Sequence, residues 1–233
     1  MKFNLRVRLT AEFLGSGFLV AAIIGSGVMG ERLAGGNVAV ALLANTLATG
    51  AALLALILTF APISGAHLNP AVTLANAIEH GIAWTDALAY MCVQCMGGIA
   101  GAIIAHLMFG LRWYSFSSHA RHGRAQVFSE FVATFGLVLV ISGGSRLGSR
   151  SVPLAVASYI TAAYWFTAST SFANPAVTIA RCLSDTFAGI RPSDVAPFIG
   201  AQLAGAWAAT FLFRWLIPHH PAHRDQVPLP CPR

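Results

Sequence analysis

The chain has 233 residues, of which 56% are hydrophobic and only 9% are charged, and its mean hydropathy is +0.69. Because about a quarter of the residues in a soluble domain are usually charged, this composition excludes an ordinary soluble protein and indicates a membrane protein. The net charge of +6 is spread over termini and loops without a basic run interleaved with aromatic residues, so we expect no nucleic-acid partner.

Six apolar segments are long enough to cross a bilayer, which needs roughly 20 residues. Only the first and fourth contain a charged residue, one glutamate each. The basic start of the chain followed by an apolar run resembles a signal peptide, but the run continues without a convincing cleavage site and predicts a retained first span. The predicted spans are Leu9–Met29, Val38–Ile63, Ala87–Leu111, Ala125–Ser145, Val152–Thr170 and Val195–Phe213.

The four cysteines do not indicate a disulfide framework or a metal site. Cys92 and Cys95 form a CxxC, but they lie in an uncharged apolar run with no second pair at zinc-binding spacing, and Cys182 and Cys231 are isolated. We therefore expect small buried thiols on a membrane helix, with no bound metal and no cofactor.

The charges at the ends of the segments favour one orientation. If both termini face the cytoplasm, that side has eight arginines and lysines and the other side has six, which is a weak positive-inside bias. Residues 218–233, rich in proline and histidine, are predicted to form a solvated, flexible extension.

Three features recur in the same order along the chain. Because the first half contains an odd number of spans, the second half enters the membrane upside down, which predicts an inverted repeat of residues 5–111 and 125–217 within one channel domain, 1–233. The features are a glutamate in an apolar segment (LTAEFLGSGFLV, 9–20; VFSEFVATFGLV, 127–138), an Asn-Pro-Ala motif (NPAVTLAN, 69–76; NPAVTIAR, 174–181) and a glutamine beside glycines (VQCMGGIAGA, 93–102; AQLAGAWAA, 201–209).

Each Asn-Pro-Ala motif predicts the start of a half-helix. Asparagine is a preferred N-cap and proline a preferred first helical residue, and the helical stretch that follows is too short to span a membrane. Inversion makes the two half-helices meet N-terminus to N-terminus, where their positive ends repel cations. The motif residues are Asn69, Pro70, Ala71, Asn174, Pro175 and Ala176, and the unwound backbone expected to present carbonyl groups to a solute is Gly65, Ala66, His67, Thr170, Ser171 and Phe172.

These motifs, together with AEF and SEF at the start of the two repeats, resemble the aquaporin (major intrinsic protein) family over about residues 5–217. The resemblance implies an all-α membrane protein with six transmembrane helices and two half-helices, one pore per subunit and a homotetramer. It also implies that Glu12 and Glu130 accept hydrogen bonds from the loops of the motifs. We read His67 as loop support, and Gly97 with Gly101 as a helix contact within the fold.

The residue after the second motif departs from the family pattern, in which an arginine is usual. Counting from the motifs, the outer selectivity filter is predicted at Thr49, Ala162, Ser171 and Val177, without the arginine and without ring side chains. Loss of five N–H donors, a charge and bulk predicts a wider, neutral filter. This filter resembles that of compact bacterial channels associated with arsenic-resistance operons.

Arg181 leaves two interpretations open. It lies four residues after Val177, on the same helical face, so it could supply a positive charge to a vestibule and favour anionic or partly ionised solutes. In the second interpretation, which we favour, Arg181 is a solvated cation that complements the C-terminus of the half-helix.

The sequence therefore predicts a passive channel, not an enzyme, in the cell (inner or plasma) membrane, with cytoplasmic termini. Its predicted solutes are small and neutral: water, polyols and above all metalloid acids such as arsenite, antimonite and methylated arsenicals. The alternatives are a general aquaglyceroporin conducting mainly water or glycerol, a secondary transporter, which would need asymmetric ionisable residues in the core, and a structural or adhesive role.

Overall fold

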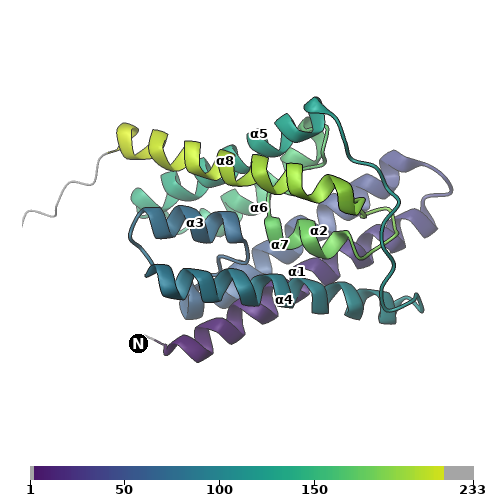
Figure 1. Cartoon of the computed structure of the whole chain (residues 1–233), viewed down its shortest axis with the longest axis horizontal. Coiled ribbons are helices and arrows are strands. Elements are labelled where there is room, and N and C mark those ends of the chain that lie inside the picture. Colours follow the sequence, from purple (N-terminus) through teal and green to yellow (C-terminus); the bar gives the residue numbers. More distant parts are fainter. Residues whose placement is uncertain (1–2, 218–233) are drawn as a thin grey trace, which may run out of the picture.

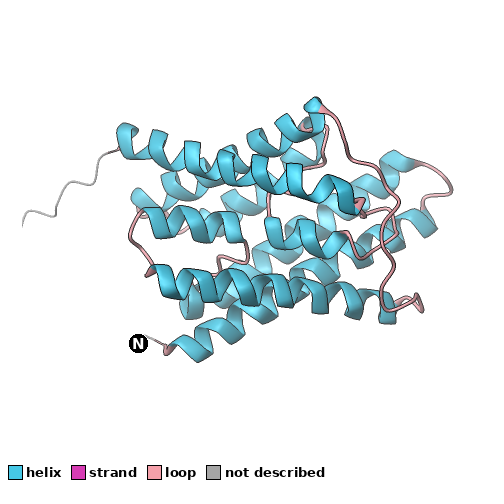
Figure 2. Cartoon of the chain, viewed as in Figure 1, coloured by secondary structure: helices cyan, strands magenta, loops and turns pink. Residues whose placement is uncertain are grey.

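The structure is a computed structural model that describes residues 3–217, and these residues form helices and loops without a strand (Figure 2). The predicted extension 218–233 lies outside the described residues, as does Cys231. In chain order the helices are α1 (Leu5–Leu33), α2 (Val38–Ser64), α3 (Pro70–Ile78), α4 (Trp84–Met108), α5 (Arg124–Arg146), α6 (Val152–Phe166), α7 (Pro175–Arg181) and α8 (Pro192–Leu216).

Five of these helices, α1, α2, α4, α5 and α8, are long and apolar enough to cross a membrane. The predicted span Val152–Thr170 is shorter than expected, because α6 has 15 residues and ends at Phe166. At 1.5 Å per residue α6 is about 22 Å long, less than the roughly 30 Å of a bilayer core. The chain leaves the helix early because residues 167–174 form the loop that leads to α7. The protein is thus a multi-pass membrane protein.

The two halves of the chain repeat the same packing. In the first half α1 packs against α2 and α4, and in the second half α5 packs against α6 and α8. Each half-helix also packs against the last long helix of the opposite half, α3 against α8 and α7 against α4, while α2 and α6 meet between the halves. Figure 1 shows the short helices α3 and α7 between the long helices α8 and α4. This arrangement is the predicted inverted repeat of three long elements and one half-helix.

Glycines allow the closest contact between helices within each half. A Cβ atom on Gly97 would lie 2.2 Å from the carbonyl oxygen of Phe13, and one on Gly101 would lie 2.1 Å from that of Gly17. In the second half, a Cβ atom on Gly205 would lie 2.5 Å from the carbonyl oxygen of Phe131. Small residues let helix backbones approach in this way, so α4 and α8 pack tightly on α1 and α5.

The ends of the helices and the long loops lie on two sides of the molecule. In Figure 1 the start of α1 and the end of α8 lie at the same end of the molecule. At the opposite end the loop after α4 pairs with the segment after α7, through hydrogen bonds from Ser115 N to Leu183 O and from Ser117 N to Cys182 O, both 2.9 Å.

The two cysteines of α4 differ from the expectation of small buried thiols on a membrane helix. Cys92 is exposed on the outside of α4, so the expectation is wrong for this residue, and Cys95 is half-buried.

Candidate functional site: the central cavity

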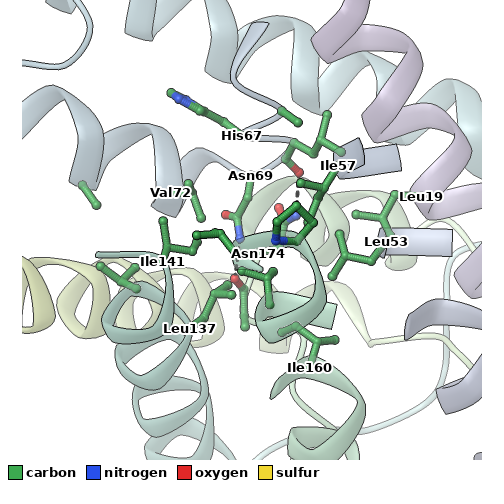
Figure 3. A pocket seen from close by; sticks show the side chains of 18 of the residues that line it. Leu19, Leu53, Ile57, His67, Asn69, Val72, Leu137, Ile141, Ile160 and Asn174 are labelled. Carbon is green, nitrogen blue, oxygen red and sulfur yellow. Dashed lines mark hydrogen bonds between the residues drawn. The ribbon is translucent and has the colours of Figure 1, made fainter. Parts of the chain in front are cut away.

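A cavity of about 640 Å³ runs through the middle of the helices and is lined by both halves of the chain. Figure 3 shows Asn69 and Asn174 side by side at its centre, with apolar side chains such as Leu53, Leu137 and Ile160 around them. We call the end lined by Thr49, Ser171, Val177 and Arg181 the filter end, and the end lined by Glu79 and Arg146 the Glu79 end.

Both Asn-Pro-Ala motifs begin a half-helix, as the sequence predicts. Asn69 caps α3 by accepting a hydrogen bond from Ala71 N at 2.8 Å, and Pro70 is the first helical residue. Asn174 caps α7 by accepting from Ala176 N at 2.9 Å and from Val177 N at 3.3 Å. The cap fixes each asparagine side chain and leaves its amide nitrogen directed away from its own helix.

The amide nitrogens join the two motifs across the centre of the cavity. Asn69 Nδ2 donates to the carbonyl oxygen of Ala173 at 2.7 Å, and Asn174 Nδ2 donates to that of Leu68 at 2.8 Å. Since an amide nitrogen carries two hydrogens, each asparagine keeps one further donor for a passing oxygen. Each asparagine can therefore donate only one of its two amide N–H groups to a solute.

Glu12 organises the loop before α3. Its Oε1 accepts from Ser64 Oγ at 2.6 Å and from His67 N at 2.9 Å, and its Oε2 accepts from Leu68 N at 2.7 Å and from Gln94 Nε2 at 2.8 Å. The carboxylate is fully buried. A buried charge is tolerated only where hydrogen bonds satisfy it, and here two come from the loop backbone and two from the side chains of Ser64 and Gln94.

Glu130 makes the corresponding contacts before α7. It accepts from Phe172 N and Ala173 N, both at 2.9 Å, and from Gln202 Nε2 at 2.6 Å. Gln202 in turn donates to Thr178 Oγ1 at 2.8 Å. The same relation links Gln94 to Thr73 at 3.0 Å in the first half. Sequence reasoning aligned the glutamines but missed both threonines, although the repeated string NPAVT contains them.

The loops in front of the half-helices carry backbone in the left-handed region. Ala66 and Leu68 have φ of 46° and 48°, and Ser171 and Ala173 have φ of 49° and 47°. Such a conformation costs a non-glycine residue about 1 kcal/mol or more, and the bonds to the two glutamates hold it in place. Of the residues predicted to present carbonyl groups, Gly65, Ala66, His67, Ser171 and Phe172 line the cavity.

Thr170 departs from that prediction, because it is not among the residues that line the cavity. Its Oγ1 accepts instead from Arg121 Nη1 at 3.4 Å. His67 has the contacts of a supporting side chain: its ring nitrogens lie 3.1 Å from Thr73 Oγ1 and 2.8 Å from Asn76 Nδ2. Its ring also packs edge-on against Tyr90.

The filter end contains three of the four residues predicted for it. Thr49, Ser171 and Val177 line the cavity there. Ala162 does not, because its side chain is exposed on the outside of α6, and the prediction for this position is wrong. The residue of α6 that faces Thr49 is Tyr164, whose hydroxyl donates to Thr49 Oγ1 at 3.3 Å. An aromatic side chain thus occupies the position expected to lack bulk.

Arg181 also lines the filter end, although it was favoured as a solvated cation. Its side chain is only 1% exposed, its Nε donates to the carbonyl oxygen of Ala188, and its Cζ lies 3.4 Å from the centre of the Phe172 ring. The expectation of a solvated side chain is therefore wrong.

Arg121, in the loop before α5, is a second buried arginine beside the same ring, with Cζ 5.0 Å from the centre of Phe172. It donates from Nε to Gly189 O at 2.8 Å and from Nη1 to Ser169 O at 3.2 Å. Burial lowers the pKa of Arg121 to about 10, so this side chain stays charged at neutral pH. No sequence motif pointed to this residue.

An ion pair marks the Glu79 end of the cavity. Arg146, in the last turn of α5, pairs with Glu79 at the C-terminal end of α3 and also donates to Phe213 O at 2.9 Å. Arg214 Nε lies 3.9 Å from the other carboxylate oxygen of Glu79. These contacts fasten α3 to the ends of α5 and α8 where the cavity opens.

Comparison with known proteins agrees with this architecture. The family description that matches the chain is Major intrinsic protein, over residues 2–146. The chain is 50% identical to the aquaglyceroporin AqpS of Rhizobium meliloti (strain 1021), over 99% of each sequence. It is 33% identical to the aquaporin NIP1-4 of Oryza sativa subsp. japonica, over 91% of this chain and 79% of that protein.

Among solved structures, the X-ray structure of the aquaglyceroporin from Plasmodium falciparum matches with a TM-score of 0.68, covering 92% of this chain and 98% of that one. At 16% sequence identity this match supports the fold alone. The fold, the paired motifs and the sequence relatives lead to one conclusion: this chain belongs to the major intrinsic protein family and is a passive channel, not an enzyme.

Proposed function

We propose that the chain conducts small uncharged solutes down their gradients, with metalloid acids such as arsenite and antimonite, and methylated arsenicals, as its favoured cargo. The observation that carries this proposal is the apolar side chain of Val177 among the residues that line the filter end. Valine offers no donor and no charge at the position after the second motif, so a solute is not required to match a fixed guanidinium there.

The wall of the cavity supports a neutral cargo. It is mostly aliphatic, with Leu19, Ile23, Leu53 and Ile160 among its residues, and the amide groups of Asn69 and Asn174 provide donors at its centre. Charged solutes lose much of their hydration in such a passage, whereas a small molecule with hydroxyl groups can exchange water for the free N–H groups of Asn69 and Asn174.

The aromatic side chain of Tyr164 limits how wide the filter end is. Its hydroxyl is already directed to Thr49, so it adds bulk without adding a free donor at that contact. We therefore infer a filter that is neutral at Val177 but narrower than Thr49 and Ala162 alone would give. A compact, pyramidal acid suits this shape better than a long polyol.

The membrane and the assembly are part of the proposal. We infer that the chain lies in the cell membrane with both termini in the cytoplasm. The start of α1 and the end of α8 lie at one end of the molecule, which supports a common side for both, and the weak excess of arginine and lysine favours the cytoplasm as that side. We further propose a homotetramer with one pore in each subunit, in a single channel domain of residues 1–233, from resemblance to the family.

A broad aquaglyceroporin for water and glycerol is the second candidate, favoured by the printed name of the Rhizobium meliloti relative. A permeability panel on the purified protein in liposomes separates the two candidates: water, glycerol, urea, arsenite and methylarsenate, each measured against empty liposomes. The proposal predicts that arsenite enters at least as fast as glycerol. Glycerol flux with no arsenite flux would support the second candidate, and flux of none of these solutes would contradict both.

A further inference from the structure

An apolar groove lies between α5 and α8 on the outside of the molecule. It has a volume of about 450 Å³ and shares no residue with the central cavity. Four of its five lining residues are apolar, and the fifth is an arginine: Val127, Phe128, Phe131, Ala201 and Arg124. The ring of Phe128 is 66% exposed, so this side of α5 faces out of the protein.

The packing of α5 on α8 explains why a groove forms there. A Cβ atom on Gly205 would lie 2.5 Å from the carbonyl oxygen of Phe131, so the two backbones are in contact at that level. Ala201, one turn nearer the start of α8, is only half-buried, and its methyl group is too small to fill the space beside α5. The floor of the groove is therefore alanine, and its wall is aromatic.

The aromatic wall extends towards the middle of the membrane. The rings of Phe128 and Phe131 are stacked with their centres 6.2 Å apart, and those of Phe131 and Phe135 are stacked 5.9 Å apart. Seven residues separate Phe128 from Phe135, which is about 10 Å along the helix axis. The wall is thus a continuous apolar strip parallel to α5, the direction in which the acyl chains of a bilayer run.

Arg124 lies at the boundary of the membrane. α5 has 23 residues and is about 34 Å long at 1.5 Å per residue, slightly more than the roughly 30 Å core of a bilayer. Its first turn therefore reaches the headgroup region. The loop after α4 leads to this turn at the end of the molecule opposite the start of α1 (Figure 1). One turn before Phe128, the groove thus passes from hydrocarbon to lipid headgroups.

The positive charge of Arg124 is not neutralised within residues 3–217. Its side chain is exposed and forms none of the ion pairs in this part of the chain, and the first turn of α5 contains no acidic residue. An arginine in the first turn is also repelled by the positive end of its own helix, so the helix does not account for it. The charge is complementary to an anion at the membrane surface.

From this geometry we propose a lipid-binding site between α5 and α8, in which Arg124 binds the phosphate of an anionic phospholipid and one acyl chain lies along Phe128 and Phe131. A zwitterionic lipid brings its own cation to Arg124, so a headgroup with net negative charge is preferred. The apolar strip begins beside the arginine, which favours a lipid over a free phosphate. The site goes beyond the proposed function, because none of its residues lines the cavity.

Native mass spectrometry of the purified protein in detergent counts bound lipids directly and yields a dissociation constant per subunit. Phosphatidylglycerol is compared with phosphatidylcholine, which lacks net charge, and with glycerophosphoglycerol, which lacks acyl chains. Arg124→Gln and Phe128→Ala test the two parts of the site. The matched controls are Arg112→Gln, at an exposed arginine in the loop after α4, and Phe18→Ala, whose ring is 63% exposed on α1.

We expect the parent to bind phosphatidylglycerol about fivefold more tightly than phosphatidylcholine, the effect of one arginine near an anionic headgroup, and Arg124→Gln to lose most of this preference. Phe128→Ala should weaken both lipids by about threefold or more, because it removes apolar contact that does not depend on the headgroup. Both control variants should match the parent. Glycerophosphoglycerol should bind far more weakly than phosphatidylglycerol, since it cannot use the groove.

Equal affinity of the parent for the two lipids would overturn the site, and so would a preference that Arg124→Gln retains or that Arg112→Gln loses to the same extent. Unchanged affinities in Phe128→Ala would mean that no acyl chain lies along this wall. Glycerophosphoglycerol that binds as tightly as phosphatidylglycerol would indicate a site for free anions instead. A change in the number of subunits in Arg124→Gln or Phe128→Ala, seen in the same spectra, would assign the groove to contact between copies of the chain and contradict the proposal.

Discussion

Single buried side chains hold the two loops of the cavity in a conformation that the loops would not adopt alone. Glu12 and Glu130 each bind two successive backbone N–H groups in a stretch where several residues have positive φ. Because an ionised carboxylate only accepts hydrogen bonds, it is suited to a site surrounded by donors. The two glutamates therefore act as structural anions, as the family resemblance implies.

Replacing Glu130 by glutamine tests that role. The amide nitrogen of glutamine is a donor and would face another donor, either Phe172 N, Ala173 N or Gln202 Nε2. We expect a loss of about 1–3 kcal/mol in stability, the cost of leaving a buried polar group unsatisfied, and a lower midpoint of thermal unfolding in detergent. Glu31→Gln, at an exposed position of α1, should leave the midpoint unchanged. Equal midpoints for Glu130→Gln and the parent would contradict this role.

The asparagine at the N-terminus of each half-helix has a separate, electrostatic role. Asn69→Asp keeps the oxygen that caps α3 but replaces the donor to Ala173 O by a negative charge at the centre of the cavity. Because the positive helix ends no longer dominate there, we expect proton and cation leak through the channel to rise. The measurement is the decay of a pH gradient in liposomes, with Asn37→Asp, at the exposed start of α2, as the control. A decay that is the same for all three proteins would argue against the electrostatic barrier.

At the scale of helices, the sequence predicted the elements but not the direction in which each side chain points. The repeat, the Asn-Pro pairs and the span lengths predicted every helix, including both half-helices. The filter residue on α6 was predicted by counting back from Asn174, which says nothing of the direction in which a side chain points. Val156, Ile160 and Tyr164 follow a four-residue spacing and line the cavity. Ala162 lies two residues from Tyr164, about 200° around the helix, and so faces outward.

Glycine contacts between helices provide a paired prediction at this scale. Gly101→Ala should destabilise the protein, because its Cβ would lie 2.1 Å from the carbonyl oxygen of Gly17 and two helix backbones would have to separate. Gly200→Ala on α8 meets no atom within 4 Å and should be neutral or stabilising by about 0.5–1 kcal/mol, the helix preference of alanine over glycine. Thermal unfolding of both variants in the same detergent measures the difference. A Gly101→Ala protein as stable as Gly200→Ala would mean that α1 and α4 are not in close contact.

At the scale of the whole molecule, duplication with an odd number of spans determines how the chain works. Inversion brings two half-helices together from opposite sides, so that residues 105 positions apart, Asn69 and Asn174, meet at the centre of one cavity. This arrangement could be predicted because the motif occurs in the same position of both halves and each half has an odd number of spans. The burial of Arg181 and Arg121 could not, because it depends on tertiary contacts with the Phe172 ring and with the backbone carbonyl groups of Ala188 and Gly189, which no motif marks. The single channel domain of residues 1–233 and the homotetramer stay predictions.

The central claim is that the residue after the second Asn-Pro-Ala motif sets which solutes pass. Val177→Arg tests it most directly, through arsenite uptake relative to water permeability in the same liposomes. We predict that arsenite uptake falls by at least about tenfold, equivalent to about 1.4 kcal/mol in the barrier, while water permeability changes by less than about threefold. An arsenite-to-water ratio identical to that of the parent would contradict the claim.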